Sequence, residues 1–248
     1  MTGGITLIQI PTVHHSFPPT PISATNKPIS AASSPPTEIR VCTNRTCRRQ
    51  GSTEILQVLT GIAPPTISVT SCGCLGRCGS GPNLVVLPSE TFVSHCATAT
   101  RAADVMGSVC GVDSVRCKKS LEALAVRKKG EAEMEKGEFV TAEMLLSQAI
   151  DLNPIGGLHY IYKSRSVARL AMNKTTAALE DALEASTLAP KYPEAYVCKG
   201  DALMAMEKYE AAADSYSTAL ELDPSIRRSK SFKARIAKLQ EKLATTNC

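Results

Sequence analysis

The chain contains no tryptophan, and aromatic residues make up only 4% of its 248 residues. This scarcity disfavours the aromatic platforms on which nucleic-acid bases stack. No apolar run reaches 18 residues, so no membrane-spanning helix is predicted. Histidine is rare as well: after residue 37 only His95 and His159 remain, and neither lies in a nucleophile motif. With no glycine-rich phosphate loop either, we expect an electron carrier or assembly factor rather than a hydrolase or transferase.

Acidic residues are absent from Met1–Thr37, which has eleven serines and threonines, seven prolines and one basic residue, Lys27. Such a segment cannot bury a core, and we expect it to be disordered. Its hydroxyl-rich, acid-free composition is typical of an organelle transit peptide, and the first arginine is Arg40. It resembles a chloroplast transit peptide, which implies a plastid protein, with cleavage near Ala31–Thr37. The alternative is a merely flexible tail.

The cysteines do not follow the pattern of a secreted disulfide scaffold. Of the ten, five lie between Cys42 and Cys78, and the rest are scattered. Cys42 and Cys47 are separated by four residues, Cys74 and Cys78 by three. In a chain without a secretory signal this spacing favours a metal site over disulfides, in a reducing compartment. Two thiolate pairs on two loops suit an iron–sulfur cluster or a zinc ion.

The residues around the second pair read CLGRCGSGPN, from Cys74 to Asn83. This run, together with the first pair, resembles the thioredoxin-like [2Fe–2S] ferredoxins and the related small subunit of NADH dehydrogenases, over Glu38–Val112. The resemblance implies four cluster ligands: Cys42, Cys47, Cys74 and Cys78. The segment between the pairs is shorter than in the NADH dehydrogenase subunit, so the docking surfaces of that subunit cannot be carried over. Zinc bound by the same four thiolates is the alternative.

Other residues near these pairs allow more than one interpretation. Cys72 is a spare ligand, a redox partner or a small buried residue, and we place it outside the ligand set. Four arginines also lie close in sequence, either for solubility or as a docking surface for an acidic partner: Arg45, Arg48, Arg49 and Arg77. The plant-type ferredoxin pattern is excluded, because no third cysteine follows Cys47 at the required spacing.

Local patterns predict a small α+β domain of thioredoxin-like order: strand, helix, strand, strand, strand, helix. Apolar periodicity and β-branched runs place these elements at Glu38–Val41, Thr53–Leu59 (with Ser52 as N-cap), Thr66–Thr70, Asn83–Leu87, Phe92–His95 and Ala97–Val109. Residues 112–119 are expected to form a linker.

From Lys118 to Pro224 the sequence has a helical repeat of 34–36 residues, aligned on Pro154, Pro190 and Pro224. Small or aromatic residues recur in register, among them Gly130, Ala142, Ala149, Ser166, Ala178, Ala185, Gly200, Ala212, Tyr216 and Ala219. This resembles three tetratricopeptide (TPR) repeats, an all-α solenoid. Ser225–Ala244 is predicted to be the capping helix that such an array needs.

The repeats also resemble co-chaperone TPR domains that clamp the C-terminal carboxylates of chaperones. The positions that match the clamp hold Arg127, Glu131, Ser164, Glu194 and Cys198. One is basic and two are acidic, so a dicarboxylate would be repelled. We expect a protein partner in the groove that is not a chaperone tail.

The C-terminal residues 225–248 carry seven basic residues and one acidic residue. On a helix, Arg228, Arg235, Lys238 and Lys242 would share one stripe. This stripe either keeps the cap soluble or attracts it to an anionic thylakoid surface or an acidic partner.

These observations together predict a plastid protein, in the stroma or on the thylakoid surface, that couples a [2Fe–2S] electron-transfer or redox-sensing domain to a TPR protein-binding module. Its expected role is assembly or redox regulation of a photosynthetic or other plastid complex. The rival hypothesis is a non-redox scaffold whose first domain holds a structural zinc ion. A thiol oxidoreductase is a weaker alternative, because no CxxC motif begins a helix.

Overall fold

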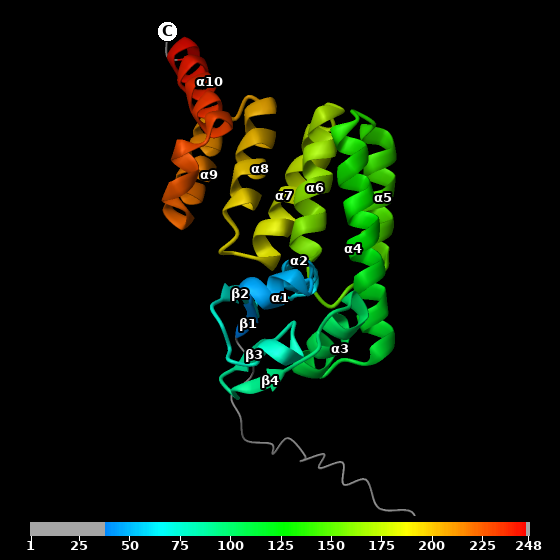
Figure 1. Ribbon diagram of the computed structural model, residues 1–248. Coiled ribbons are helices and arrows are strands. Elements are labelled where there is room, and N and C mark those ends of the chain that lie inside the picture. Colours follow the sequence, from blue (N-terminus) through cyan, green and yellow to red (C-terminus); the bar gives the residue numbers. More distant parts are fainter. Residues whose placement is uncertain (1–37, 247–248) are drawn as a thin grey trace, which may run out of the picture. The chain divides into compact units, whose positions relative to one another are not determined.

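The structure, a computed structural model, describes residues 38–246 (Figure 1). The predicted transit segment Met1–Thr37 and the last two residues lie outside this range. None of the described helices is both long and apolar enough to cross a membrane.

The first part of the chain folds as a four-stranded sheet with helices. In chain order its elements are β1 (Glu38–Cys42), α1 (Arg45–Arg49), α2 (Ser52–Ile62), β2 (Ser68–Cys72), the 3₁₀ turn η1 (Cys78–Ser80), β3 (Leu84–Leu87), β4 (Thr91–Val93) and α3 (Ala99–Cys110). The predicted order of strands and helices is present, and α1 and η1 are added to it.

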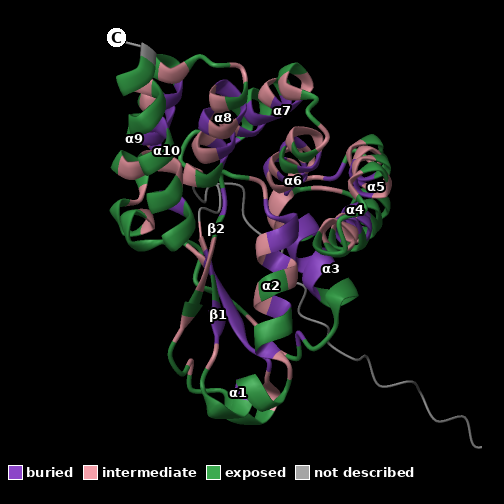
Figure 2. Ribbon diagram, turned by 90° about the horizontal axis from the view of Figure 1, so that it is seen from above, coloured by how far each residue is buried: buried purple, intermediate pink, exposed green. Residues whose placement is uncertain are grey.

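The strand order across the sheet is β2-β1-β3-β4. β1 is parallel to β2 and antiparallel to β3, and β4 is antiparallel to β3. Parallel neighbours end at the same edge of a sheet, so Cys42 and Cys72, which face each other in register, both lie at that edge. β1 is buried along most of its length (Figure 2). Its Ile39 and Val41 pack with Leu59 of α2 and Met106 of α3 in one core.

Two local predictions for this part were wrong. Ser52 is not an N-cap: Gly51 takes that position with a φ of 91°, and Ser52 is fully buried in the first turn of α2. The second strand starts at Ser68 rather than Thr66, because the Ile67 N–H donates to the Pro64 carbonyl in a turn.

Helix α1 was not predicted. Asn44 caps it by accepting a hydrogen bond from the Arg45 N–H at 2.6 Å.

The second part consists of helical hairpins, as the repeat predicted. They are formed by α4 (Ser114–Glu135) with α5 (Phe139–Asp151), α6 (Leu158–Ala171) with α7 (Thr175–Leu188), and α8 (Pro193–Ala205) with α9 (Tyr209–Leu222). Pro154, Pro190 and Pro224 each follow the second helix of a pair, where proline cannot continue the helix. Gly200 packs so closely on the Tyr216 ring that a Cβ would lie 2.4 Å from it.

The expected linker at residues 112–119 is absent from the structure, because α4 begins at Ser114. Asp113 caps α4 through a 2.9 Å hydrogen bond from the Arg116 N–H. Cys117 and Leu124 of α4 are buried in the same core as the sheet. The Gly157 N–H, before α6, also donates to the Ala63 carbonyl at 3.1 Å. The first half of α4 therefore packs in the core of the sheet, whereas Leu146 and Ala149 of α5 belong to a separate core.

The predicted single C-terminal helix is interrupted. The 3₁₀ turn η2 (Pro224–Arg228) comes first, Ser229 is extended, and α10 (Lys230–Thr246) follows. Phe232 and Leu239 of α10 are buried against the last hairpin, as a capping helix requires.

The predicted basic stripe of this region needs correction. Arg235 does not lie free on the surface: its Nε is 2.7 Å from Oδ1 and 2.8 Å from Oδ2 of Asp201 in α8. Asp201 also accepts a 2.6 Å hydrogen bond from the Tyr216 hydroxyl. Arg235 therefore fastens the cap to the last hairpin and is not available to a membrane.

Candidate functional site

The four predicted ligand cysteines come together at one edge of the sheet. Cys42 ends β1, Cys47 lies in α1, and Cys74 and Cys78 lie on the loop that follows β2. The first pair is almost fully buried, each thiol residue being 2% exposed, whereas the second pair is exposed. The site thus has an inner and an outer pair of thiols.

The two thiols of the outer pair lie close together. The Cys74 and Cys78 Sγ atoms are 3.5 Å apart. Two thiolates on one tetrahedral metal ion with bonds of about 2.3 Å would be roughly 3.8 Å apart. The side chains of Cys42 and Cys47 influence each other's pKa, and charge on either of them raises the pKa of Cys78.

Hydrogen-bond donors surround these sulfur atoms. The Gly76 N–H lies 3.4 Å from the Cys74 Sγ, and the Asn83 side-chain amide lies 3.6 Å from the Cys47 Sγ. The same amide donates to the Arg77 carbonyl at 2.7 Å, which connects the inner pair to the outer loop. Such donors tune a metal centre by lowering the charge on its sulfur ligands.

Gly81 leaves the space that the site needs. A Cβ at this position would lie 3.0 Å from the Cys47 Sγ and would overlap the Gln50 side chain. The backbone therefore approaches the inner pair as only glycine allows.

The environment affects the thiols unequally. Burial alone would raise the pKa of Cys42, but hydrogen bonds from the backbone of Asn44 and Leu75 and from Cys47 hold it below the ordinary value. The pKa of Cys47 is raised, chiefly by burial. The pKa of Cys78 is raised by its hydrogen bond to Cys74 and by the neighbouring thiolate charge. Crowded thiolates that repel one another are the arrangement that a bound cation relieves.

The two thiol pairs are the candidate metal ligands of this site. Within residues 38–246, no three or more histidine, cysteine or acidic side chains converge tightly enough to hold one ion. A two-iron cluster does not require that convergence, since each iron takes one pair of thiolates and bridging sulfides separate the irons. Four cysteine thiols in two pairs fit the ligand set of a [2Fe–2S] cluster, and four thiolates are a ligand set of zinc as well.

Among the other described cysteines, Cys72 lies beside the two pairs, and Cys96, Cys110, Cys117 and Cys198 are buried or half-buried. Cys72 is half-buried, and burial raises its pKa. Burial also raises the pKa of Cys96 to about 11 and that of Cys198 to about 12, which makes both poor nucleophiles. Cys117 is a core residue.

A second candidate site involves the first helices of the hairpins. The Ser164 hydroxyl of α6 donates to Glu131 of α4 at 2.8 Å, and the same Glu131 oxygen lies 3.5 Å from the Arg127 Nε. The Arg127 guanidinium lies over the Tyr160 ring, 5.0 Å from its centroid. Cys198 of α8 is buried. The one basic residue at the clamp positions is thus already paired with an internal carboxylate.

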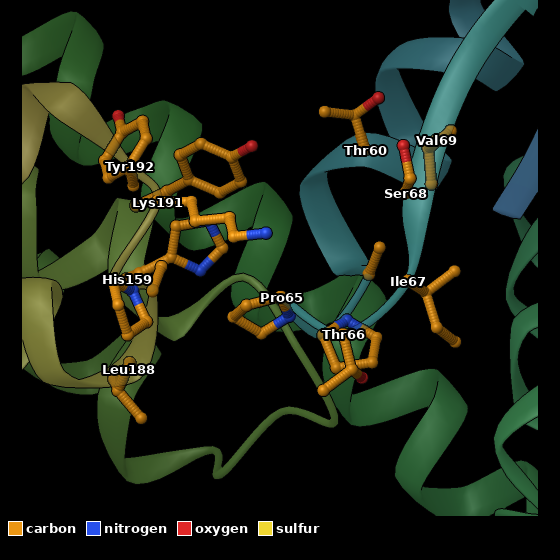
Figure 3. Close-up of a pocket in the computed structure, with 15 residues that line it drawn as sticks. Thr60, Pro65, Thr66, Ile67, Ser68, Val69, His159, Leu188, Lys191 and Tyr192 are labelled. Atoms are coloured by element: carbon orange, nitrogen blue, oxygen red, sulfur yellow. The ribbon is translucent and has the colours of Figure 1, made fainter. Parts of the chain in front are cut away.

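Beside these residues is a cavity of about 600 Å³ between the turn before β2 and the helical hairpins (Figure 3). His159 and Tyr192 line it on the hairpin side, Pro65 and Ile67 on the sheet side. The His159 ring is 4.0 Å from the Tyr160 ring and 5.2 Å from the Tyr192 ring, centroid to centroid. Its Nδ1 is buried without a hydrogen-bond partner. Such a lining can accept an apolar segment of another protein.

Two parts of these sites were missed from sequence. Asn83 donates a hydrogen bond to Cys47, and the only hint of this in the sequence is that Asn83 directly follows Gly81-Pro82 in the cysteine motif. The aromatic group of His159, Tyr160 and Tyr192 could not be seen in the sequence. Tyr192 reaches the other two rings only because α6 packs against the start of α8.

Comparison with known proteins concerns the helical part. Residues 193–226 match the tetratricopeptide repeat family. The chain is 31% identical over 103 residues to "Protein STIP1 homolog" of Dictyostelium discoideum, which covers 42% of this chain and 18% of that protein. It is 27% identical over 126 residues to "Small glutamine-rich tetratricopeptide repeat-containing protein 2" of Mycosarcoma maydis, and this match covers 51% of this chain and 34% of that protein. The chain thus spans about a third or less of these relatives.

Among solved structures, the first TPR domain of human RPAP3 is similar, with a TM-score of 0.46, 26% identity, and coverage of 50% of this chain and 94% of that one. The TPR domain of Arabidopsis OM64 has a TM-score of 0.44 and 26% identity, and the match covers 48% of this chain and 94% of that one. The family match at residues 193–226 and the repeated helical hairpins support TPR repeats in the helical part. These likenesses do not assign the cysteine-bearing part.

Proposed function

We propose that this chain is a plastid [2Fe–2S] protein. In this proposal a thioredoxin-like domain carries the cluster for electron transfer or redox sensing, and the TPR module binds a partner. The expected setting is the assembly or redox regulation of a photosynthetic or other plastid complex. The observation that carries the proposal is the pairing of Cys42 with Cys47 and of Cys74 with Cys78 at one sheet edge.

The thioredoxin-like assignment rests on topology. A sheet of order β2-β1-β3-β4, with only the β1–β2 pair parallel and with α2 joining those two strands, is the arrangement expected of that fold. Because β1 and β2 are parallel, the loops that follow them leave the sheet at the same edge, and these loops bear the thiols.

Each of the four cysteines would ligate iron, and Gly76 and Asn83 would donate to the sulfur ligands. The bound cluster would supply one-electron chemistry. The buried inner pair would shield it from water, and the exposed outer pair would bring it close to the surface.

The test is reconstitution of the full chain with iron and sulfide, followed by metal analysis and visible spectroscopy. We expect a red-brown protein with two irons and two sulfides per chain. Cys42→Ser, Cys47→Ser, Cys74→Ser or Cys78→Ser should bleach or destabilise it, whereas Cys72→Ser, a matched change beside the site, should not. A colourless protein that binds one zinc would refute the proposal and support the zinc scaffold instead.

The plastid location is supported by the composition of Met1–Thr37, which lies outside the described residues. Fusion of residues 1–37 to a fluorescent protein should direct it into isolated chloroplasts. If the fusion stays outside chloroplasts, the location is wrong while the cluster proposal stands.

A further inference from the structure

Four arginines lie on the two segments that hold the cysteine pairs. Arg45, Arg48 and Arg49 belong to α1, the helix that also holds Cys47, and Arg77 lies on the loop between Cys74 and Cys78. All four are exposed. Most of α1 and its flanking residues are coloured as exposed in Figure 2.

This positive charge is not neutralised within the fold. From Arg40 to Ser89 the sequence contains a single acidic residue, Glu54. In the described part of the chain, the ion pairs join none of the four arginines to a carboxylate, and the nearby Glu38 pairs with Arg40. Arg77 instead lies over the Phe92 ring, 4.7 Å from its centroid, which keeps its charge in place at the loop.

The location of this charge matters because α1 also holds Cys47, and Arg77 lies between the two exposed thiols in the chain. Cys42 and Cys47 are buried, while Cys74 and Cys78 are exposed and flank Arg77 in sequence. A partner that exchanges electrons with the site must approach the exposed pair, where Arg77 lies, and α1 adds three more exposed arginines beside Cys47.

We infer that this arginine surface (Arg45, Arg48, Arg49 and Arg77) is the docking site for an acidic electron-transfer protein. This inference rests on the proposed cluster. One electron passes from the reduced partner, which is thereby oxidised, to the oxidised cluster, and no bond or proton needs to move. Complementary charge raises the rate of such encounters by about 10- to 1,000-fold, and salt removes the effect.

The experiment is stopped-flow reduction of the reconstituted full chain by a reduced, acidic plant-type ferredoxin, followed by bleaching of the visible band. We expect the second-order rate to fall at least about tenfold between 10 and 300 mM NaCl. The quadruple variant Arg45→Gln, Arg48→Gln, Arg49→Gln and Arg77→Gln should be about 10- to 100-fold slower at low salt and equal to wild type at high salt.

A matched control removes four exposed charges elsewhere: Arg101→Gln, Arg116→Gln, Lys118→Gln and Lys119→Gln. It has the same net charge as the first variant and should keep nearly the wild-type rate. Equal rates for the two variants at low salt would overturn the docking site and leave the cluster intact. A deficit that persists at high salt would show a changed reduction potential instead and would equally overturn it. A protein without visible absorption would overturn the cluster proposal itself, and the docking inference with it.

Discussion

The Arg235 guanidinium of α10 and the Asp201 carboxylate of α8 are joined by a short ion pair that fastens the C-terminal helix to the last TPR hairpin. Both side chains are partly shielded, at 34% and 18% exposure, and the Tyr216 hydroxyl bonds to the same carboxylate. This group of three residues connects the cap to α9 as well as to α8.

Replacing Asp201 by alanine leaves the Arg235 charge and the Tyr216 hydroxyl without this partner. We expect the free energy of unfolding to fall by about 1–3 kcal/mol, less than for a fully buried pair because water still screens Arg235. Urea unfolding followed by circular dichroism measures this. Asp214→Ala, an exposed aspartate of α9, is the control and should change stability by less than about 0.5 kcal/mol. Equal effects of the two substitutions would contradict a structural role for the pair.

His159 makes stability depend on pH. Burial, with the nearby Arg127 charge, lowers its pKa from 6.5 to about 4. The unfolded chain therefore binds this proton before the folded chain does, and the free energy of unfolding falls as the pH drops from about 6.5 toward about 4. At about 1.36 kcal/mol per pH unit, the loss between pH 6.5 and 5 is at most about 2 kcal/mol.

His159→Gln should remove this slope between pH 6.5 and 5, a range in which most carboxylates stay ionised in both states. His95→Gln, at an exposed position, serves as the control and should keep the wild-type slope. Thermal unfolding at several pH values gives the comparison. A wild-type slope in His159→Gln would assign the pH dependence to other groups.

Leu124 tests the core that α4 shares with the sheet. It is 6% exposed, and a Cβ on Gly61 of α2 would lie 2.7 Å from its side chain. Leu124→Ala should cost about 2–4 kcal/mol and speed hydrogen exchange in β1 and β3 as well as in α4. The control Leu146→Ala removes an equally large side chain from the separate core of the first hairpin and should affect α4 and α5 most. If Leu124→Ala leaves exchange in β1 and β3 unchanged, the two parts are energetically separate.

The groove should not bind chaperone tails. Glu131 already accepts from Ser164 and pairs with Arg127, and Glu194 adds a second negative charge at the clamp positions. We expect no measurable calorimetric binding of the HSP90 peptide SRMEEVD, while the Spaghetti (RPAP3) TPR domain, solved bound to that peptide, serves as the positive control. The variant Glu131→Asn with Glu194→Lys should gain affinity. Micromolar binding by the wild type would reverse this expectation.

Much of this architecture was predictable from sequence, for identifiable reasons. The helical hairpins follow from a repeat that ends at Pro154, Pro190 and Pro224, since proline position and helical period are local properties. The convergence of Cys42, Cys47, Cys74 and Cys78 follows from a strong motif.

Long-range packing was not predictable. Cys117 belongs with the scattered cysteines when the sequence is read alone, because burial of one thiol leaves no periodic signal. The Arg235–Asp201 pair lies 34 residues apart in the chain, so helix geometry alone placed Arg235 in a surface stripe. Both errors arise where one side chain contacts a residue distant in sequence.

The contact of Gly156 and Gly157 with the turn at Ala63 limits how this protein can vary. A Cβ at Gly156 would lie 2.2 Å from the Ala63 backbone, and one at Gly157 would lie 2.1 Å from the Gly61 carbonyl. Flexible linkers tolerate insertions, but the turn at Gly156 and Gly157 does not, because its backbone is in direct contact with the backbone at Gly61 and Ala63. Residues inserted between α3 and α4 would also move Cys117 out of the core. The cysteine-bearing sheet and the first TPR hairpin are therefore expected to be inherited together, and neither can be exchanged as an independent cassette.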